Sequence, residues 1–562
     1  MPRIKIDNKI VISYDYVARD KYWGALSKYL IDRHGKEHFT DQPKVEEILF
    51  DSFDFLIQNF KQLISTEKKF TFFLYTHWLH EQSIQIYVKT LGGFELEKIG
   101  ESEFAMYRRI LKLILEQGCE IDLEWGGMPT GEEVLVMDEK IQELIYLGTW
   151  MYEFADKISF QKMIEECHQI YFDEENLLVI DWQYHYGQTY NQLFPMLVED
   201  YKKGTFDEQA VFELRAKIEE CFNIEYNYAG GIIFEIQKHH SPQAPDLQTI
   251  EPYILPLNLI QAYGISKELA ETFYSGLTIS RDNKLTIEDA IRKPHSTKRY
   301  MFRPILVYKI GGVDRALVGK EKFVESIMVL STNAIHWNAM LDEWLSLGCI
   351  KSFINEKGNT HDKILEDKIE DIVKNKGLLY CRNIKSFKQL AGKNNVNIDN
   401  NIAGEIDLIV VNHKLKTIYV ADAKYNRARY EAVGYRMDYT QFINPEKPNK
   451  SHEAKLTKKT NWVSNNLDVL KEHLCVIYNK TDIDLNGYKV EGIFIINTPT
   501  FYMFNGQFKA ITLKQFGDFI EGKYEYPDLF IIDGEGDDET LMTVKHPYFR
   551  KPLIITDDQF ND

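Results

Sequence analysis

Three polar side chains interrupt two neighbouring apolar runs of this 562-residue chain. Asp407 lies in the run 405–411, and Asp422 and Lys424 lie at the end of the run that begins at Thr417. Side chains alternate between the faces of a strand, so Asp422 and Lys424 share a face if their run is extended. Two desolvated carboxylates repel each other unless a cation joins them, and carboxylate oxygens suit Mg²⁺ or Mn²⁺. These residue types therefore predict a divalent-metal site of the kind that hydrolyses phosphodiesters.

The elements that must position these side chains follow from apolar spacing. The runs 405–411 and 417–423 are predicted to form a β-hairpin, because β-branched residues crowd both and a short polar turn separates them. An amphipathic helix over 365–373 and a strand over 378–384 are expected before the hairpin. The elements expected after it are a helix capped by Ser451 that carries Trp462 to Leu474, a buried strand over 490–497, a strand over 508–511 and a helix opening at Thr512. This order predicts an α/β domain with a mixed sheet.

The hairpin residues resemble the PD-(D/E)xK nuclease superfamily, whose signature is an Asp on one strand followed, after a hairpin, by Asp or Glu, any residue, and Lys. The match covers Asp407 and Asp422-Ala423-Lys424, with Gly404 before the first Asp. Ile406 stands where many members of that superfamily have Pro. The resemblance covers roughly the last third of the chain and implies a restriction-endonuclease-like fold.

The resemblance also implies roles for individual residues. The groups expected to hold Mg²⁺ or Mn²⁺ are Asp407, Asp422, the backbone carbonyl of Ala423 and Glu366 on the preceding helix. Lys424 is expected to orient the attacking water and to stabilise charge on the phosphate, and the products should carry 5′-phosphate and 3′-hydroxyl ends. Lys455 and Lys459 lie four residues apart on the predicted helix after the hairpin. They therefore share a face and are predicted to contact the backbone of a nucleic acid.

The charge distribution favours a nucleic-acid partner for this part of the chain only. Residues 351–480 hold 23 Lys and Arg against 16 Asp and Glu, a balance of +7 that leaves −25 for the rest of the −18 chain. A basic segment can neutralise phosphates while its acidic companions limit non-specific binding. We expect the nucleic acid to be DNA rather than RNA.

Composition excludes several classes of protein. An apolar content of 44% and an aromatic content of 13% are too high for wholesale disorder. The chain has no apolar run long enough to span a membrane and no phosphate-binding Gly-x-x-x-x-Gly-Lys-Ser/Thr motif, so neither membrane insertion nor ATP hydrolysis is expected. Its six cysteines are far apart in the sequence, which predicts a reducing cytoplasmic location without a disulfide framework or a zinc ribbon.

We predict a multidomain chain of four parts. Residues 1–245 should form a mainly helical region, residues 246–347 a small α+β segment, residues 348–530 the nuclease-like α/β domain and residues 531–562 an acidic, loop-rich tail. The first boundary rests on residues 239–256, which gather four of the 16 prolines.

The function predicted from these observations is a metal-dependent DNA endonuclease. A nuclease domain behind a long N-terminal region is similar in architecture to bacterial restriction or phage-defence effectors, and such a region would control or target the nuclease. That region could also support a homo-oligomer or bind a protein partner. The alternative is a non-catalytic nucleic-acid-binding or assembly subunit that retains the fold.

Overall fold

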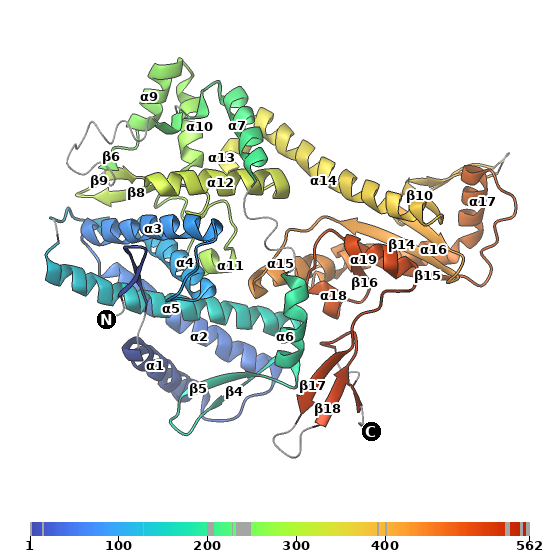
Figure 1. Cartoon of the computed structure of the whole chain (residues 1–562), viewed down its shortest axis with the longest axis horizontal. Helices are drawn as coiled ribbons and strands as arrows, with labels where there is room; N and C mark the ends of the chain where they lie inside the picture. The colour runs from blue at the N-terminus through green and yellow to red at the C-terminus, as the bar shows by residue number, and fades with distance from the viewer. Residues whose placement is uncertain are drawn as a thin grey trace. The chain divides into compact units, whose positions relative to one another are not determined.

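The computed structural model describes residues 3–13, 16–127, 129–198, 207–227, 229–231, 249–390, 393–398, 402–533, 540–550 and 555–557. The chain, whose course Figure 1 shows, groups into two compact units. Unit 1 comprises Met1–Ile158, His168–Asp181 and Thr205–Lys357, and unit 2 comprises Ser159–Cys167, Trp182–Gly204 and Gly358–Asp562. The predicted multidomain organisation with helical and α/β parts is therefore confirmed.

This grouping differs from the four-part division predicted from the sequence. The segment 246–347 does not stand apart, because it packs with most of the N-terminal region in unit 1. Residues 159–167 and 182–204 belong to unit 2, although they were assigned to the N-terminal region. Most of the proline-rich stretch that suggested the first boundary, including His239 and His240, lies outside the described residues.

Unit 1 is built mainly from helices with one apolar face. Its helical elements are α1 (Tyr16–His34), α2 (Gln42–Ser65), α3 (Phe70–Leu91), α4 (Glu101–Gly118), most of α5 (Gly131–Met163), α7 (Glu208–Phe222), α9 (Ile254–Tyr263), α10 (Lys267–Gly276), α11 (Ile287–Arg292), α12 (Lys320–Trp337), α13 (Asp342–Leu345) and the start of α14 (Gly348–Asn375). In α2, the carboxylate of Asp41 accepts the backbone N–H of Lys44 at the N-terminus, and Val45, Ile48 and Leu49 are buried on one side.

The strands of unit 1 are short. They are the hairpin β1 (Arg3–Ile6) and β2 (Lys9–Ile12), the strand β4 (His168–Phe172) with most of its partner β5 (Leu178–Trp182), and a sheet of β3 (Asp122–Leu123), β6 (Thr249–Ile250), β7 (Thr278–Ile279), β8 (Ile305–Ile310) and β9 (Val313–Leu317). The strand β8 begins at Ile305. The residues before it turn so that Arg303 becomes buried.

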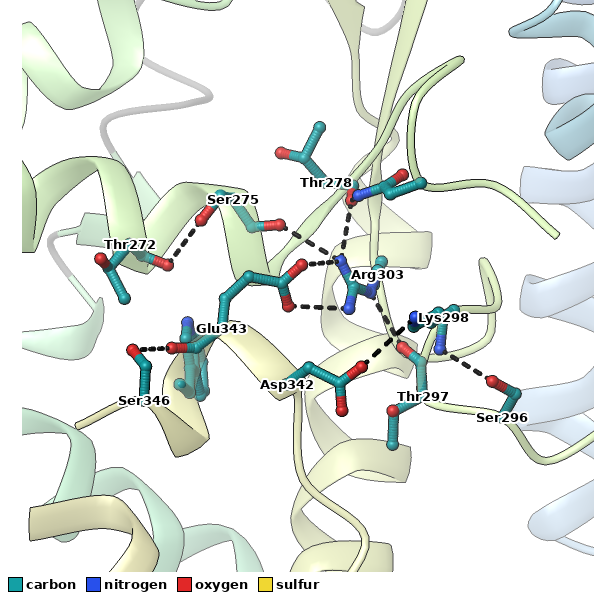
Figure 2. Close-up of polar contacts among 12 residues, drawn as sticks. Thr272, Ser275, Thr278, Ser296, Thr297, Lys298, Arg303, Asp342, Glu343 and Ser346 are labelled. Atoms are coloured by element: carbon teal, nitrogen blue, oxygen red, sulfur yellow. Dashed lines mark hydrogen bonds and ion pairs between the residues drawn. The ribbon is translucent and has the colours of Figure 1, made fainter. Parts of the chain in front are cut away.

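Arg303 connects several segments of unit 1, as Figure 2 shows. Its guanidinium donates to both carboxylate oxygens of Glu343 in α13, at 2.9 and 2.8 Å. It also donates to the backbone carbonyl of Thr297 at 2.9 Å and to those of Ser275 and Thr278 at 3.3 Å each. The side chain of Arg303 is only 1% exposed, so this ion pair fixes α13 against the turn that precedes β8.

A disulfide joins Cys221 at the end of α7 to Cys349 at the start of α14, with the two Cα atoms 5.8 Å apart. The prediction of a chain without disulfides is wrong on this point. The two residues are 128 positions apart in the sequence, so only the folded chain shows that they are neighbours. Cys119, Cys167, Cys381 and Cys475 are buried free thiols.

Unit 2 contains a mixed five-stranded sheet in the order β10 (Leu379–Ile384), β13 (Ile406–Asn412), β14 (Thr417–Lys424), β15 (Lys489–Ile496) and β16 (Lys509–Thr512). β13 pairs antiparallel with β10 and with β14, whereas β15 is parallel to β14 and to β16. These strands match those predicted from the sequence within one or two residues. The predicted mixed sheet of an α/β domain is therefore confirmed.

Helices cover both faces of this sheet. On one face, α14 and α19 (Leu513–Ile520) pack against side chains that include Leu408, Val410 and Ala421. On the other face, the side chains of β13 and β14 at alternate positions pack with α15 (Ala432–Ile443), α16 (His452–Asn465) and α17 (Leu467–Tyr478). The single helix expected after Ser451 is broken near Asn466 into α16 and α17.

The remaining elements complete unit 2. They are α6 (Tyr186–Leu197), β11 (Ser386–Phe387), β12 (Val396–Asn397), η2 (Pro448–Lys450), α18 (Tyr502–Asn505), β17 (Leu529–Asp533), β18 (Thr540–Val544) and β19 (Ile555–Asp557). The loop-rich tail expected from residue 531 instead begins within a three-stranded sheet of β17, β18 and β19. Tyr548 and Phe549 of this tail are buried in the core of unit 2. No described helix has both the length and the hydropathy needed to cross a membrane.

Candidate active site

The two acidic residues of the motif face one another across neighbouring strands of unit 2. Leu408 of β13 is paired with Ala421 of β14, so Asp407 and Asp422 are the next residues along the two strands. Leu408 and Ala421 face α14, and strand alternation therefore directs Asp422 and Lys424 to the face that α16 covers. Asp407 contacts Lys459 of α16 and also lines a pocket with Glu366 of α14. The expectation that Asp422 and Lys424 share a face is confirmed by their direct ion pair.

Hydrogen bonds fix the end of β14 between the acids. Asp407 Oδ2 accepts the backbone amide of Ala423 at 3.0 Å. Lys424 Nζ lies 2.5 Å from Asp422 Oδ2 and donates to the carbonyl oxygen of Ala423 at 3.3 Å. The two carboxylates, the Ala423 carbonyl and the Lys424 ammonium therefore form one polar cluster. The Asp422 side chain is only 4% exposed, whereas that of Lys424 is 22% exposed.

Lys459 adds a second ammonium to the cluster. Its Nζ donates to Asp422 Oδ1 at 2.5 Å and to Asp407 Oδ1 at 3.4 Å. We expected Lys459 to contact a nucleic-acid backbone from an exposed helix face, but it is 7% exposed and bound to the acids. A signal for this position exists in the sequence, because Lys459 lies between the buried residues Leu456 and Val463 at spacings of three and four. Lys455 is exposed, so its predicted contact with phosphate stays a prediction.

The pKa values of the two acids are shifted in opposite directions. Burial and the nearby charge of Asp422 raise the pKa of Asp407 to about 6. Burial also acts to raise the pKa of Asp422, but the ammonium groups of Lys424 and Lys459 hold it well below its usual range. Burial acts to lower the pKa of Lys459, yet Asp422 and Asp407 raise it above its ordinary value. Asp422 and Lys459 are therefore a charged pair at neutral pH.

Glu366 lies near Asp407 but is not joined to it. Both residues line a small pocket together with Arg382 and Ala423. The Glu366 carboxylate is bound by the guanidinium of Arg382, with Nη2 at 3.2 Å from Oε2. Arg382 on β10 also pairs with Asp367 at 2.8 Å and with Glu370.

The sequence placed Glu366 correctly on the helix before the hairpin, but it gave no sign of Arg382. Glu366 belongs to α14, which covers the sheet face opposite to that of Asp422 and Lys424. Arg382 holds three acidic side chains of this helix, so it fixes α14 on β10 and neutralises Glu366. The interaction between the half-buried Arg382 and acids 12 to 16 residues earlier could be found only from the fold.

The donor set fits a divalent cation at Asp407 and Asp422, because the structure places a cation, the Lys459 ammonium, between their Oδ1 atoms. The carbonyl of Ala423 offers a further hard oxygen ligand beside them. Glu366 does not complete a tight group. Among the described residues, the one set of three His, Cys, Asp or Glu ligand atoms within 4.8 Å of one another is His34, Glu47 and Asp51 in unit 1.

Basic side chains of the protein already pair with His34, Glu47 and Asp51. Lys44 lies 2.9 Å from His34 and 2.8 Å from Glu47, and Arg33 lies 2.8 Å from Asp51. The candidate active site therefore remains the cluster around Asp407 and Asp422. No protein-family model matches the chain, and no curated protein or solved structure is similar enough to count as a match.

Proposed function

We propose that unit 2 is the catalytic domain of a metal-dependent nuclease with a restriction-endonuclease-like fold, and that its substrate is DNA. The observation that carries the proposal is the meeting of Asp407, Asp422 and Lys424 at the ends of two central strands of a mixed sheet. A buried and a half-buried carboxylate beside ammonium groups can bind a divalent cation and a phosphate in the same place.

Asp407 and Asp422 would hold Mg²⁺ or Mn²⁺ together with the carbonyl of Ala423. The bound cation would supply charge stabilisation at the phosphate and a water of lowered pKa. Lys424 is the more exposed ammonium of the cluster, so it can orient that water or meet the phosphate oxygens. The amide of Ala423 holds Asp407 in place and thereby sets the separation between the two acids. Glu366 would act only if Arg382 released it.

The test is cleavage of supercoiled plasmid, linear duplex DNA and RNA by the full chain, with Mg²⁺, with Mn²⁺ and with a chelator. We expect cleavage of DNA only with metal, and a loss of at least about 100-fold in Asp422→Asn, which removes a ligand charge but keeps the side-chain shape. Glu405→Gln is the matched control, because Glu405 lies two residues before Asp407 and its side chain is 43% exposed. Rejoining of the products by a ligase without prior phosphorylation would show 5′-phosphate and 3′-hydroxyl ends.

One observation favours the alternative of a non-catalytic nucleic-acid-binding or assembly subunit. Both carboxylate oxygens of Asp422 are already paired with ammonium groups, so the buried acid needs no metal to be stable. A protein of this kind would bind DNA without cleaving it, and Mg²⁺ or Mn²⁺ would not raise its melting temperature.

The rest of the proposal concerns unit 1. We propose that it restrains or targets the nuclease, as in restriction or phage-defence systems, because a free nuclease would endanger the DNA of its own cell. Most of the acidity of the chain lies outside residues 351–480, so acidic surface would disfavour casual binding of DNA. Unit 1 could also bind a protein partner or a second copy of the chain. Measuring the mass in solution with and without DNA would separate these two roles.

A further inference from the structure

We infer that Lys459 is a built-in cation of the acid pair, which a divalent metal must displace in order to bind between Asp407 and Asp422. This inference rests on the proposed function insofar as it takes the two acids to be metal ligands. It goes beyond that function because it assigns to Lys459 the control of metal affinity.

The geometry of Lys459 supports this role. Its ammonium is the one group among the described residues shown to contact Oδ1 of both acids, at 2.5 Å from Asp422 and 3.4 Å from Asp407. A metal that bridged the same oxygens would need the same space, since two cations cannot lie within bonding distance of both atoms without strong repulsion. Lys424 differs, because its ammonium pairs with Oδ2 of Asp422. Displacing Lys459 would therefore leave Lys424 paired.

The packing of α16 keeps the ammonium in this position. Leu456 and Val463, one turn before and one turn after Lys459, are both wholly buried, and α16 packs against β14 and β15. Ser451 caps the helix by accepting the backbone N–H of Ala454 at 3.0 Å. Lys459 therefore projects from a rigid element, and its side chain alone can move away from the acids. The displaced ammonium would stay close enough to meet an anionic phosphate.

The charge of the cluster explains why displacement has a cost. Two carboxylates and two ammonium groups balance one another, and the Lys459 side chain is only 9% exposed. A metal must break a buried, charge-assisted hydrogen bond before it gains its own ligands. Such bonds are strong enough to weaken an equilibrium by a factor of about 10 to 100. The metal affinity of the natural protein should be reduced by roughly that factor.

The experiment measures Mn²⁺ binding to the full chain by calorimetry, without any nucleic acid. Lys459→Met removes the ammonium and keeps an unbranched apolar stem. We expect its dissociation constant for Mn²⁺ to fall by about tenfold or more relative to the natural protein. Lys458→Met is the control, because Lys458 is the exposed neighbour on the same helix, and its Mn²⁺ affinity should not change. Lys459→Gln serves as a second test if the Met variant does not fold.

Each outcome decides a different point. An unchanged or weaker Mn²⁺ affinity in a folded Lys459 variant would overturn the inference, since the ammonium would then not compete with the metal. Absence of Mn²⁺ binding in both proteins at millimolar metal would overturn the inference and the proposed function together. Tighter Mn²⁺ binding by the variant, with no DNA cleavage by the natural protein, would support the role of Lys459 and reject only the nuclease.

Discussion

The carboxylate of Asp407 accepts a hydrogen bond of 3.0 Å from the backbone amide of Ala423. Asp407 thereby holds Ala423, the residue between Asp422 and Lys424, in place. Oδ2 of Asp407 performs this structural task, while Oδ1 faces the ammonium of Lys459. The two oxygens of one side chain can therefore be tested separately.

We predict that Asp407→Asn keeps the fold and loses cleavage. The Asn side-chain oxygen can still accept the amide of Ala423, but its amide group cannot ligate a cation as a carboxylate does. Cleavage should fall by at least about 100-fold, as for a lost metal ligand. Asp407→Leu removes both functions, and its melting temperature should be lower than that of Asp407→Asn because the partly buried amide of Ala423 loses its acceptor. Equal melting temperatures for the two variants would contradict the structural role.

Cleavage should decrease as the pH falls through about 6. The pKa of Asp407 is raised to about 6, so this acid is protonated at lower pH and cannot bind a metal. At metal concentrations below saturation, the single-turnover rate at saturating DNA should fall about tenfold for each pH unit below 6 and level off above it, because the metal binds only the deprotonated acid. A flat profile between pH 5 and 7 would contradict the assignment.

The same shift has a consequence for stability. The folded pKa of Asp407 lies above its ordinary value of 3.8, so the folded state binds more protons than the unfolded state between these values. This group therefore contributes most to stability below about pH 4, and that contribution is lost as the pH rises to about 6. Bound metal would reverse this pH dependence of stability, because it favours the charged carboxylate of Asp407.

Much of this site could be predicted from the sequence because local patterns specify it. The β-branched and apolar residues that crowd the runs around Asp407 and Asp422 predicted β13 and β14, and the polar residues within them marked the positions that face a partner. Thr512 gave the start of α19, where it forms a capping box with Gln515. Such features depend on residues close in the chain.

The parts that were missed depend on contacts between distant residues. Lys455 and Lys459 have the same charge and lie one turn apart, yet one is exposed and the other is buried against two acids. The apolar residues Leu456 and Val463 mark the side of α16 that carries Lys459, but its acidic partners appear only when α16 packs on β14. The role of Arg382 and the pairing of Cys221 with Cys349 could not be predicted from the sequence either, because tertiary structure brings these partners together.

Replacing Arg303 with Met should destabilise unit 1. The change leaves the carboxylate of Glu343 without its guanidinium partner and removes the donor to three backbone carbonyls (Figure 2). Because Glu343 is 28% exposed, we expect a loss of about 2 to 4 kcal/mol, somewhat below the range for a fully buried pair. The matched control is Lys298→Met, since Lys298 and Asp342 form an exposed pair at 3.5 Å. That variant should change the free energy of unfolding by less than about 1 kcal/mol.

Reduction of the disulfide should lower the stability of unit 1. A bridge between Cys221 and Cys349 closes a long loop and restricts the unfolded chain, which contributes about 2 to 4 kcal/mol. Under oxidising conditions, Cys221→Ser should melt at a lower temperature than the natural protein. With excess dithiothreitol, the two proteins should melt at similar temperatures. A difference that persists in the reductant would show that the serine itself, and not the missing bridge, is destabilising.

A fragment of residues 351–562 should not fold cooperatively, although it contains every residue of the proposed active site. Residues 159–167 and 182–204 supply part of the core of unit 2, where Phe160, Met163 and Ile164 and also Tyr186, Leu193 and Leu197 are at most 7% exposed. Burial of each such side chain contributes roughly 2 kcal/mol. Six of them together match the whole stability of a typical domain, about 5 to 15 kcal/mol.

Polar contacts also join the segments 159–167 and 182–204 to the rest of unit 2. The side-chain amide of Asn505 donates to the carbonyl of Met163 at 3.1 Å, and that of Gln192 in α6 donates to the carbonyl of Phe530 in β17 at 2.6 Å. Circular dichroism of the fragment 351–562 should show a broad, non-cooperative thermal transition. A second fragment that joins residues 159–204 to 358–562 regains these side chains and should melt in a single sharp transition. A sharp transition in the shorter fragment would mean that the segment 159–204 is dispensable for the fold of unit 2.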